Sequence, residues 1–127
     1  MQQLMFDIDG PRFVDTQGRH AILRGVNLGG DSKIPLSHAG PIPPRDFADH
    51  RSVSFIGRPF PLEEADEHLG RIRGWGFNVL RLLTCWEAVE HAGHGQYDEA
   101  YLDYLAAVCA KAGEHGLAVF IDFHQDV

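Results

Sequence analysis

The chain has 127 residues, of which 44% are hydrophobic and 23% charged, as is usual for a single globular domain. Its net charge of −7 argues against a nucleic-acid partner, because binding to phosphates needs a basic surface. No apolar run reaches the ~20 residues of a membrane-spanning helix, and the opening MQQLMFDIDG is unlike a signal peptide, so we expect a cytoplasmic protein with reduced cysteines.

Residues 1–22 are expected to form a short β-hairpin that precedes the first core strand. Apolar runs lie on both sides of the turn-forming residues Asp15–Gly18. The second of these runs continues over Ile22–Asn27, which we interpret as a core strand ended by Gly29 and Gly30.

A long loop is expected over residues 31–61. Most of the prolines lie in this segment, and its apolar residues follow no helical or strand period. Loops longer than about 15 residues without secondary structure of their own are usually functional or disordered.

Two helices and two further strands follow in alternation. The first helix, over residues 61–76, has acidic residues in its first turn and arginines in its last, which suits the helix dipole. The second helix, over residues 97–116, has Asp98 as its expected N-cap and Gly116 beyond its end. The apolar runs FNVLRLLTCW and LAVFIDF predict a strand after each helix.

This order of strand, helix, strand, helix and strand predicts an α/β fold. Its strands should be parallel and buried on both faces. In such folds the side chains that carry chemistry gather at the carboxyl ends of the strands. Polar residues end all three predicted core strands, so we expect a functional site at this edge of the sheet.

Arg81 and His124 are the strongest candidates for this site. A guanidinium inside an apolar strand is costly to bury unless acceptors meet it, so Arg81 serves either a site or a structural salt bridge. His124 directly follows an apolar strand, and Asp126 lies two positions later. Because strand residues alternate between faces, Asp122 shares a side with His124 and is a candidate partner for Arg81 or for the backbone.

A metal site is the competing interpretation of the histidines. His124 with Asp126, or His91 with His94, would supply two ligands. The second pair lies in a glycine-rich loop that offers no third ligand. We therefore expect neither a metal ion nor a cofactor.

Two further side chains follow the ends of predicted strands. Trp86 either packs against the end of its strand or stacks on a sugar ring or a lipid. Lys33 lies in a loop after glycines, where a lysine is usually only solvated.

Three segments of the chain match a known family, and they are RHAILRGVNLGG, GFNVLRLLTCWEAVE and FIDFHQD. Together they resemble the opening third of the family five glycoside hydrolases, which are retaining (β/α)8 barrels. A finer resemblance, to endoglycoceramidases and their fungal relatives that cleave glucosylceramide or steryl glucosides, rests on LRGVNLGGDSKIP, WEAVEHAGHGQYDEAYLDY and DFHQDV. His91 departs from the family pattern, because many relatives have proline there.

The resemblance implies a partial (β/α)8 barrel with a role for each candidate residue. Residues 1–127 would be the N-terminal third of the catalytic domain, with strands one to three and two helices after the hairpin. Arg81 would keep the nucleophilic carboxylate ionised and oriented, and His124 would contact the sugar. Asp126 and Lys33 would hydrogen-bond sugar hydroxyls, and Trp86 would support the floor of the site.

The two catalytic carboxylates are expected outside this chain. Retaining hydrolysis needs two carboxylates about 5–5.5 Å apart, which the family supplies as glutamates at the ends of strands four and seven. No Asn-Glu pair occurs in the 127 residues. We therefore expect the chain to be a fragment that is inactive by itself.

The expected function is that of the N-terminal part of a hydrolase acting on a glycolipid or another β-glucoside. With a glycolipid substrate, the protein could contact the membrane surface through the lipid. The sequence does not predict the oligomeric state. Two alternatives remain, an endoglucanase-type polysaccharide hydrolase and a non-catalytic truncated α/β product. The 31–61 loop contains several apolar side chains, which either cover the lipid part of a substrate or form an ordinary cap packed on the top of the barrel. These side chains are Ile42, Phe47, Val53, Phe55, Ile56 and Phe60.

Overall fold

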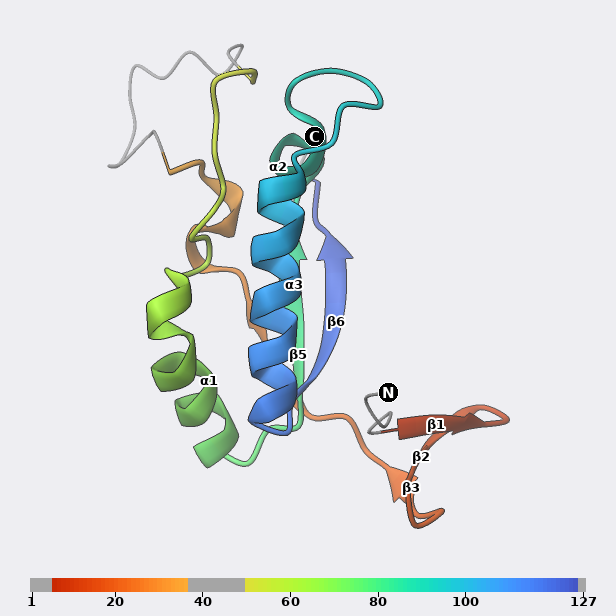
Figure 1. Cartoon of the computed structure of the whole chain (residues 1–127). Helices are drawn as coiled ribbons and strands as arrows, with labels where there is room; N and C mark the ends of the chain where they lie inside the picture. The colour runs from red at the N-terminus through yellow and green to blue at the C-terminus, as the bar shows by residue number, and fades with distance from the viewer. Residues whose placement is uncertain (1–5, 37–49, 126–127) are drawn as a thin grey trace.

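The computed structural model describes residues 6–36 and 50–125 of the chain. Two three-stranded sheets and several helices make up this part of the molecule (Figure 1). In chain order the elements are β1 (Phe6–Asp9), β2 (Arg12–Asp15), β3 (His20–Ala21), β4 (Gly25–Leu28), η1 (Gly30–Lys33), η2 (Leu62–Glu64), α1 (Ala65–Gly74), β5 (Val79–Thr84), α2 (Trp86–Glu90), α3 (Glu99–Glu114) and β6 (Ala118–Phe123).

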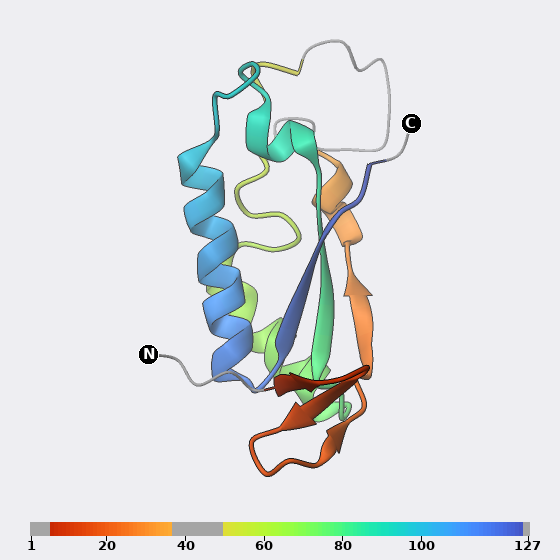
Figure 2. The ribbon, with the colours of Figure 1, turned by 90° about the vertical axis from the view of Figure 1, so that its right-hand side faces the viewer.

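The main sheet has the order β4-β5-β6, and both of its strand pairs are parallel. Figure 2 shows α1 and α3 on the same side of these strands, with no described helix on the other side. The α/β architecture with parallel strands that the sequence predicts is therefore confirmed. In the described part of the chain helices cover one face of the sheet and the other face is open, so the predicted burial of the strands on both faces is not found there.

The core lies between the main sheet and its helices. Residues of β5 alternate between the two faces, so Leu80, Leu82 and Thr84 are buried toward the helices while Arg81 lies on the open face. The helix residues buried in this core are Ala65, Leu69, Ile72, Tyr101, Tyr104, Leu105, Val108 and Ala112. The predicted amphipathic helices therefore turn their apolar faces to the sheet.

Both ends of α3 agree with their sequence signals. Asp98 accepts a hydrogen bond through Oδ1 from the backbone N–H of Tyr101 at 2.9 Å, as an N-cap does. Gly116, two residues past the helix, has a φ of 69°, which glycine adopts without steric strain. The predicted cap and the predicted stop are both confirmed.

The N-terminal region differs from the predicted hairpin. It forms a three-stranded antiparallel sheet, in which β1 adds a strand before the expected β2–β3 turn. In Figure 1 this small sheet lies beyond the amino-terminal ends of the main strands. The first core strand starts at Gly25 instead of Ile22. The cause is Asn78, whose side chain accepts from the Arg24 N–H at 2.8 Å and donates to the Ile22 carbonyl at 3.0 Å.

A third α-helix, α2, replaces the end of the predicted second strand. The sequence predicts only two helices, whereas α2 begins at Trp86, directly after β5, and buries Ala88 and Val89. Five residues make little more than one helical turn, so they are too few to show a helical period of apolar residues.

The second part of the predicted loop, residues 50–61, packs into the core. Val53, Phe55 and Phe60 are only 6%, 1% and 5% exposed. Tyr104 donates a hydrogen bond from Oη to the Phe60 carbonyl at 2.6 Å, which fixes the segment to α3. Burial raises the pKa of Tyr104 to about 12, so its hydroxyl keeps the proton that it donates.

Because Val53, Phe55 and Phe60 are buried in the protein core, they favour the interpretation of the loop as an ordinary packed cap over its interpretation as a cover for a lipid. Ile56 differs, because 39% of it is exposed. Ile42 and Phe47 lie outside the described residues. Within the described ranges no helix is long and apolar enough to cross a lipid bilayer.

The cysteines are free thiols in a largely apolar setting. Cys85 is buried at the end of β5, and Cys109 is half-buried on α3. Burial raises the pKa of both thiols above the ordinary cysteine value. Both side chains are therefore held in the protonated form, as expected for reduced structural cysteines.

Candidate functional site

Arg81 is the centre of a polar cluster on the open face of the main sheet. Its Nη2 donates to Oδ2 of Asp122 at 2.7 Å, and its Nη1 donates to Oδ1 of Asn27 at 3.3 Å. The Arg81 side chain is 35% exposed and that of Asp122 is 23% exposed, so the pair is partly shielded from water. The guanidinium therefore has the acceptors that its position in an apolar strand requires.

His124 joins the same cluster from the end of β6. Its Nδ1 lies 3.4 Å from Oδ2 of Asp122 and 3.4 Å from Nη2 of Arg81. Its backbone N–H donates to the Thr84 carbonyl at 2.9 Å, so the chain beyond β6 stays bound to β5. The predicted proximity of Arg81 and His124 is thus found in the structure.

Strand alternation and register together explain this convergence. In the parallel register Asn27 pairs with Arg81, which places both side chains next to each other on one face. On β6, Asp122 pairs with Leu83, and the side chains of Asp122 and His124 project on that same face. The cluster therefore lies toward the carboxyl ends of the three strands, where parallel sheets carry their chemistry.

An apolar hollow of about 300 Å³ lies beside the cluster on the open face. Arg81 and Asn27 contribute its polar groups, and the remaining lining residues are Leu23, Gly25, Val26, Val79 and Phe120. Phe120 is 60% exposed although it lies in the middle of β6. Gly25 and Val79 are the first residues of β4 and β5, so the hollow extends from the cluster toward the amino-terminal ends of these strands.

Lys33 and Trp86 lie at the carboxyl ends of the neighbouring strands. Lys33 is the last residue of η1, directly after β4, and is exposed. Trp86 begins α2 and is 67% exposed, and its backbone N–H donates to Oε1 of Gln125 at 3.3 Å. This exposure is compatible with stacking on a ligand. Asp126 lies outside the described residues.

Asp122 and Asn27 both contact Arg81, and these contacts are only partly predictable from the sequence. Asp122 is predicted as a partner of the backbone or of Arg81, and the ion pair confirms the second of these roles. Asn27 is visible in the sequence only as a polar strand end, and its contact with Arg81 depends on a register between residues 54 positions apart. Asp122 can be recognised in the sequence because it lies two positions before His124, and residues two apart in an extended chain project on the same face.

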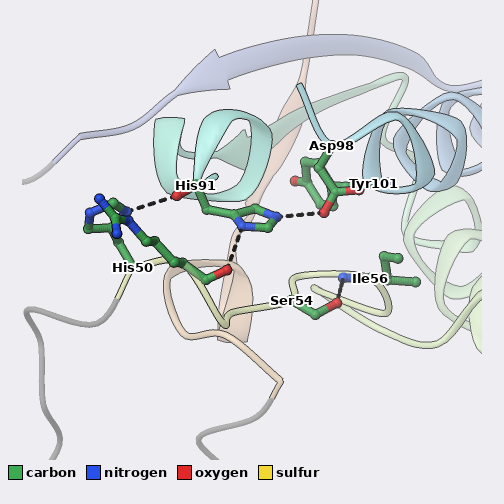
Figure 3. A network of polar contacts seen from close by, with 7 residues as sticks. His50, Ser54, Ile56, His91, Asp98 and Tyr101 are labelled. Atoms are coloured by element: carbon green, nitrogen blue, oxygen red, sulfur yellow. Dashed lines mark hydrogen bonds and ion pairs between the residues drawn. The ribbon is translucent and has the colours of Figure 1, made fainter. Parts of the chain in front are cut away.

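His91, directly after α2, belongs to a separate structural network (Figure 3). His91 contacts Oδ2 of Asp98 through Nε2 at 2.9 Å and the Arg51 carbonyl through Nδ1 at 3.1 Å. The carbonyl of His91 in turn contacts Nδ1 of His50 at 2.8 Å. His91 therefore joins the 50–61 segment to the N-terminus of α3.

These contacts differ from those of a metal ligand. Both ring nitrogens of His91 face protein oxygens, and His94 is fully exposed in the loop. The described part of the chain has no group of three or more His, Cys, Asp or Glu side chains placed to hold a metal ion.

Asp98 makes the stability of the α3 N-terminus dependent on pH. Burial acts to raise its pKa, but hydrogen bonds from His91 and from the Tyr101 N–H outweigh burial and hold the pKa below the ordinary value. A carboxylate with a lowered pKa stabilises the folded state fully above its unfolded pKa of about 3.9, and this contribution is lost as the pH falls through the lower folded value.

We expect the protection of the α3 N-terminus against hydrogen exchange, relative to the intrinsic exchange rate at each pH, to decrease as the pH falls below the unfolded pKa of about 3.9 and through the lower folded pKa of Asp98. Asp98→Asn keeps a good N-cap without a titrating group, so its exchange should change less over the same pH range. Mass spectrometry of peptides covering residues 98–104 would measure this difference at matched pH. Equal acid sensitivity in both proteins would contradict the assignment to Asp98.

Comparison with known proteins agrees with this arrangement of strands and polar groups. The sequence profile described as cellulase, glycosyl hydrolase family 5, matches residues 45–127. The chain belongs to glycosyl hydrolase family 5.

Relatives within this family include glycolipid-cleaving enzymes. A glucosylceramidase of Rhizopus delemar is 46% identical over 121 residues, which cover 92% of this chain and 18% of the relative. A glucosylceramidase of Cryptococcus neoformans is 46% identical over 120 residues, covering 94% of this chain and 16% of the relative. The chain thus spans less than a fifth of the length of these relatives.

A solved family 5 structure has the same fold over most of the chain. Sterylglucosidase 1 of Cryptococcus neoformans superposes with a TM-score of 0.81 at 43% identity, over 91% of this chain and 16% of the other. The predicted partial (β/α)8 barrel is confirmed, with the three parallel strands of the main sheet as its strands. The open face that carries Arg81 and His124 is then the face that a barrel turns inward.

Proposed function

We propose that this chain supplies the first three strands of a retaining β-glycosidase that acts on a glycolipid such as glucosylceramide or a steryl glucoside. The observation that carries the proposal is the cluster of Arg81, Asp122 and His124 at the carboxyl ends of two neighbouring parallel strands in a family 5 chain. Active sites of (β/α)8 enzymes lie at this end of the barrel.

In this proposal the chain binds and orients, and the bond-breaking carboxylates come from outside residues 1–127. One glutamate would protonate the leaving oxygen, and the other would attack the anomeric carbon to form a glycosyl-enzyme intermediate that water then hydrolyses. Arg81 would donate to the attacking carboxylate and keep it ionised, since a guanidinium retains its charge at all relevant pH values.

The remaining predicted residues would recognise the sugar. His124 and Asp126 would hydrogen-bond hydroxyls from the third strand, and Lys33 would do so from η1. Trp86 would offer an apolar ring face next to the sugar, which its exposure supports. Polar groups placed around one apolar surface are typical of sites for small ligands.

A glycolipid is favoured as substrate by the relatives described above. The two relatives at 46% identity are glucosylceramidases, and the solved structure at 43% identity is a sterylglucosidase. Such a substrate would bring the enzyme to a membrane surface, because its lipid part stays in the bilayer. The profile's description as a cellulase supports the second candidate, a polysaccharide hydrolase of the endoglucanase type.

The test is hydrolysis by the whole protein of glucosylceramide, ergosteryl β-glucoside and carboxymethyl cellulose, with residues 1–127 alone as a matched sample. We expect the whole protein to release sugar from a lipid substrate with retention at the anomeric carbon, which proton NMR would detect, and residues 1–127 to be inactive. Activity on cellulose alone would favour the endoglucanase. Inactivity on all three would favour the non-catalytic product.

A further inference from the structure

We propose that Asp122 is a positioning residue that fixes Arg81 and His124 relative to each other. This inference rests on the proposed function, because it assigns a role within the same site. Asp122 lies on β6 with its side chain only 23% exposed, between the two residues that we expect to serve the nucleophile and the sugar.

One carboxylate oxygen of Asp122 lies close to both Arg81 and His124. Oδ2 of Asp122 lies 2.7 Å from Nη2 of Arg81 and 3.4 Å from Nδ1 of His124, while those two nitrogens are 3.4 Å apart. The short contact is a charge-assisted hydrogen bond, and the longer one is an ion pair only when His124 is protonated.

The donors available determine how the protons are arranged. A guanidinium has only N–H donors, so Nδ1 of His124 is the acceptor in its contact with Nη2 of Arg81. Oδ2 of Asp122 accepts from Nη2 of Arg81 and holds this donor beside Nδ1 of His124, which places the hydrogen of a neutral His124 on Nε2. Nε2 then carries the hydrogen and can donate it to a sugar hydroxyl. Asp122 thereby determines which ring nitrogen of His124 accepts.

The backbone hydrogen bonds of His124 fix its main chain but not the orientation of its side chain. The His124 N–H donates to the Asp122 carbonyl at 3.0 Å and to the Thr84 carbonyl at 2.9 Å, so the backbone position of His124 is set by β5 and β6. The side chains of His124 and Arg81 have rotatable bonds of their own, which side-chain contacts have to order. Holding both in one arrangement before substrate binds removes an entropic barrier to catalysis.

Asp122→Asn is the variant that isolates this role in the whole protein. The amide has the same shape and one acceptor oxygen, but it lacks the charge that binds the Arg81 guanidinium. The matched control is Asp103→Asn, since Asp103 is exposed on the helical side of the fold, on α3. We expect Asp122→Asn to lower kcat/KM by about tenfold or more, with a thermal midpoint close to that of the wild type.

A double-mutant cycle separates positioning from general structural damage. If Asp122 acts through His124, Asp122→Asn should have a much smaller effect on kcat/KM in a His124→Ala background, giving a coupling of about tenfold. Equal fold losses in both backgrounds would overturn the inference. A loss of activity that parallels a large fall in the thermal midpoint would also overturn it.

Crystal structures of the whole wild-type and Asp122→Asn proteins provide a readout that does not need activity. We expect the Arg81 guanidinium and the His124 ring to lie further apart, or in other rotamers, in the variant. Unchanged positions of both side chains would overturn the inference even if the enzyme is active. If the wild type hydrolyses no β-glucoside, the proposed function fails, and these two structures still decide whether Asp122 positions its neighbours.

Discussion

Replacing Arg81 with alanine is expected to lower kcat/KM of the whole protein on a β-glucoside by about 10²–10³-fold, the loss seen when one preorganised donor is removed from a charged transition state. The guanidinium already lies in the polar cluster, held by Asp122 and Asn27, so its orientation does not have to form during the reaction. Steady-state kinetics with glucosylceramide or a steryl glucoside would measure the change.

The same substitution should affect stability much less than activity. Both members of the Arg81–Asp122 pair are partly exposed, at 35% and 23%, and partly exposed ion pairs contribute about 1 kcal/mol or less. We therefore expect a cooperative thermal transition within a few degrees of the wild type. Arg71→Ala is a suitable control, because Arg71 pairs with Glu67 on the exposed side of α1. Near-normal turnover by Arg81→Ala would contradict the role assigned to this residue.

The largest effect on stability is expected from Gly25→Ala in β4. A Cβ at this position would lie 2.0 Å from the carbonyl oxygen of Val79 and 2.7 Å from its Cγ1. Gly25 pairs with Val79 in the parallel register, so the main obstacle is the backbone of a neighbouring strand and cannot rotate away. The strands would have to separate, and we expect a loss of more than about 4 kcal/mol in the free energy of unfolding.

Two other glycines provide graded controls for this prediction. Gly74 is the last residue of α1, and a Cβ added there would have no atom within 4 Å, so Gly74→Ala should be neutral or slightly stabilising. A Cβ on Gly29 would lie 3.1 Å from Cδ2 of Leu83, a side chain that can move, so its effect should be intermediate. Thermal unfolding followed by circular dichroism ranks the three variants. A Gly25→Ala protein as stable as the wild type would contradict the parallel pairing of Gly25 with Val79.

The elements that local signals define were predictable from the sequence. α3 has its N-cap at Asp98 and its stop at Gly116, and each signal acts through residues within one turn of the helix. The strands β5 and β6 follow from mostly apolar runs, which only Arg81 interrupts in β5 and only Asp122 in β6. Their parallel pairing follows from the helices between them.

The elements that long-range contacts define were not predictable. The start of β4 at Gly25 depends on Asn78, which lies 54 positions after Arg24 and takes the backbone groups of Ile22 and Arg24. α2 is too short to show a period, and the short β1–β3 sheet has few apolar residues to define its strands. The buried state of Phe55 depends on contacts with the helices, which no local pattern contains.

The candidate site shows the same division. Arg81 and His124 are recognisable because each places an ionisable group at an otherwise apolar strand, and Asp122 follows from alternation on β6. The contact of Asn27 with Arg81 needs the register of β4 on β5, which the sequence does not specify. Composition and periodicity also do not identify the sugar or the lipid of a substrate. The proposed substrate therefore rests on the family resemblance and on the relatives.

The central claim is that the cluster around Arg81 forms one side of a sugar site. A crystal structure of the whole protein with a bound β-glucoside inhibitor tests it most directly. We predict the sugar on the inner face of the barrel, with a ring nitrogen of His124 about 3 Å from a hydroxyl and Arg81 about 3 Å from a glutamate supplied from outside this chain. A sugar bound away from His124, with Arg81 paired only to Asp122 and Asn27, would contradict the account.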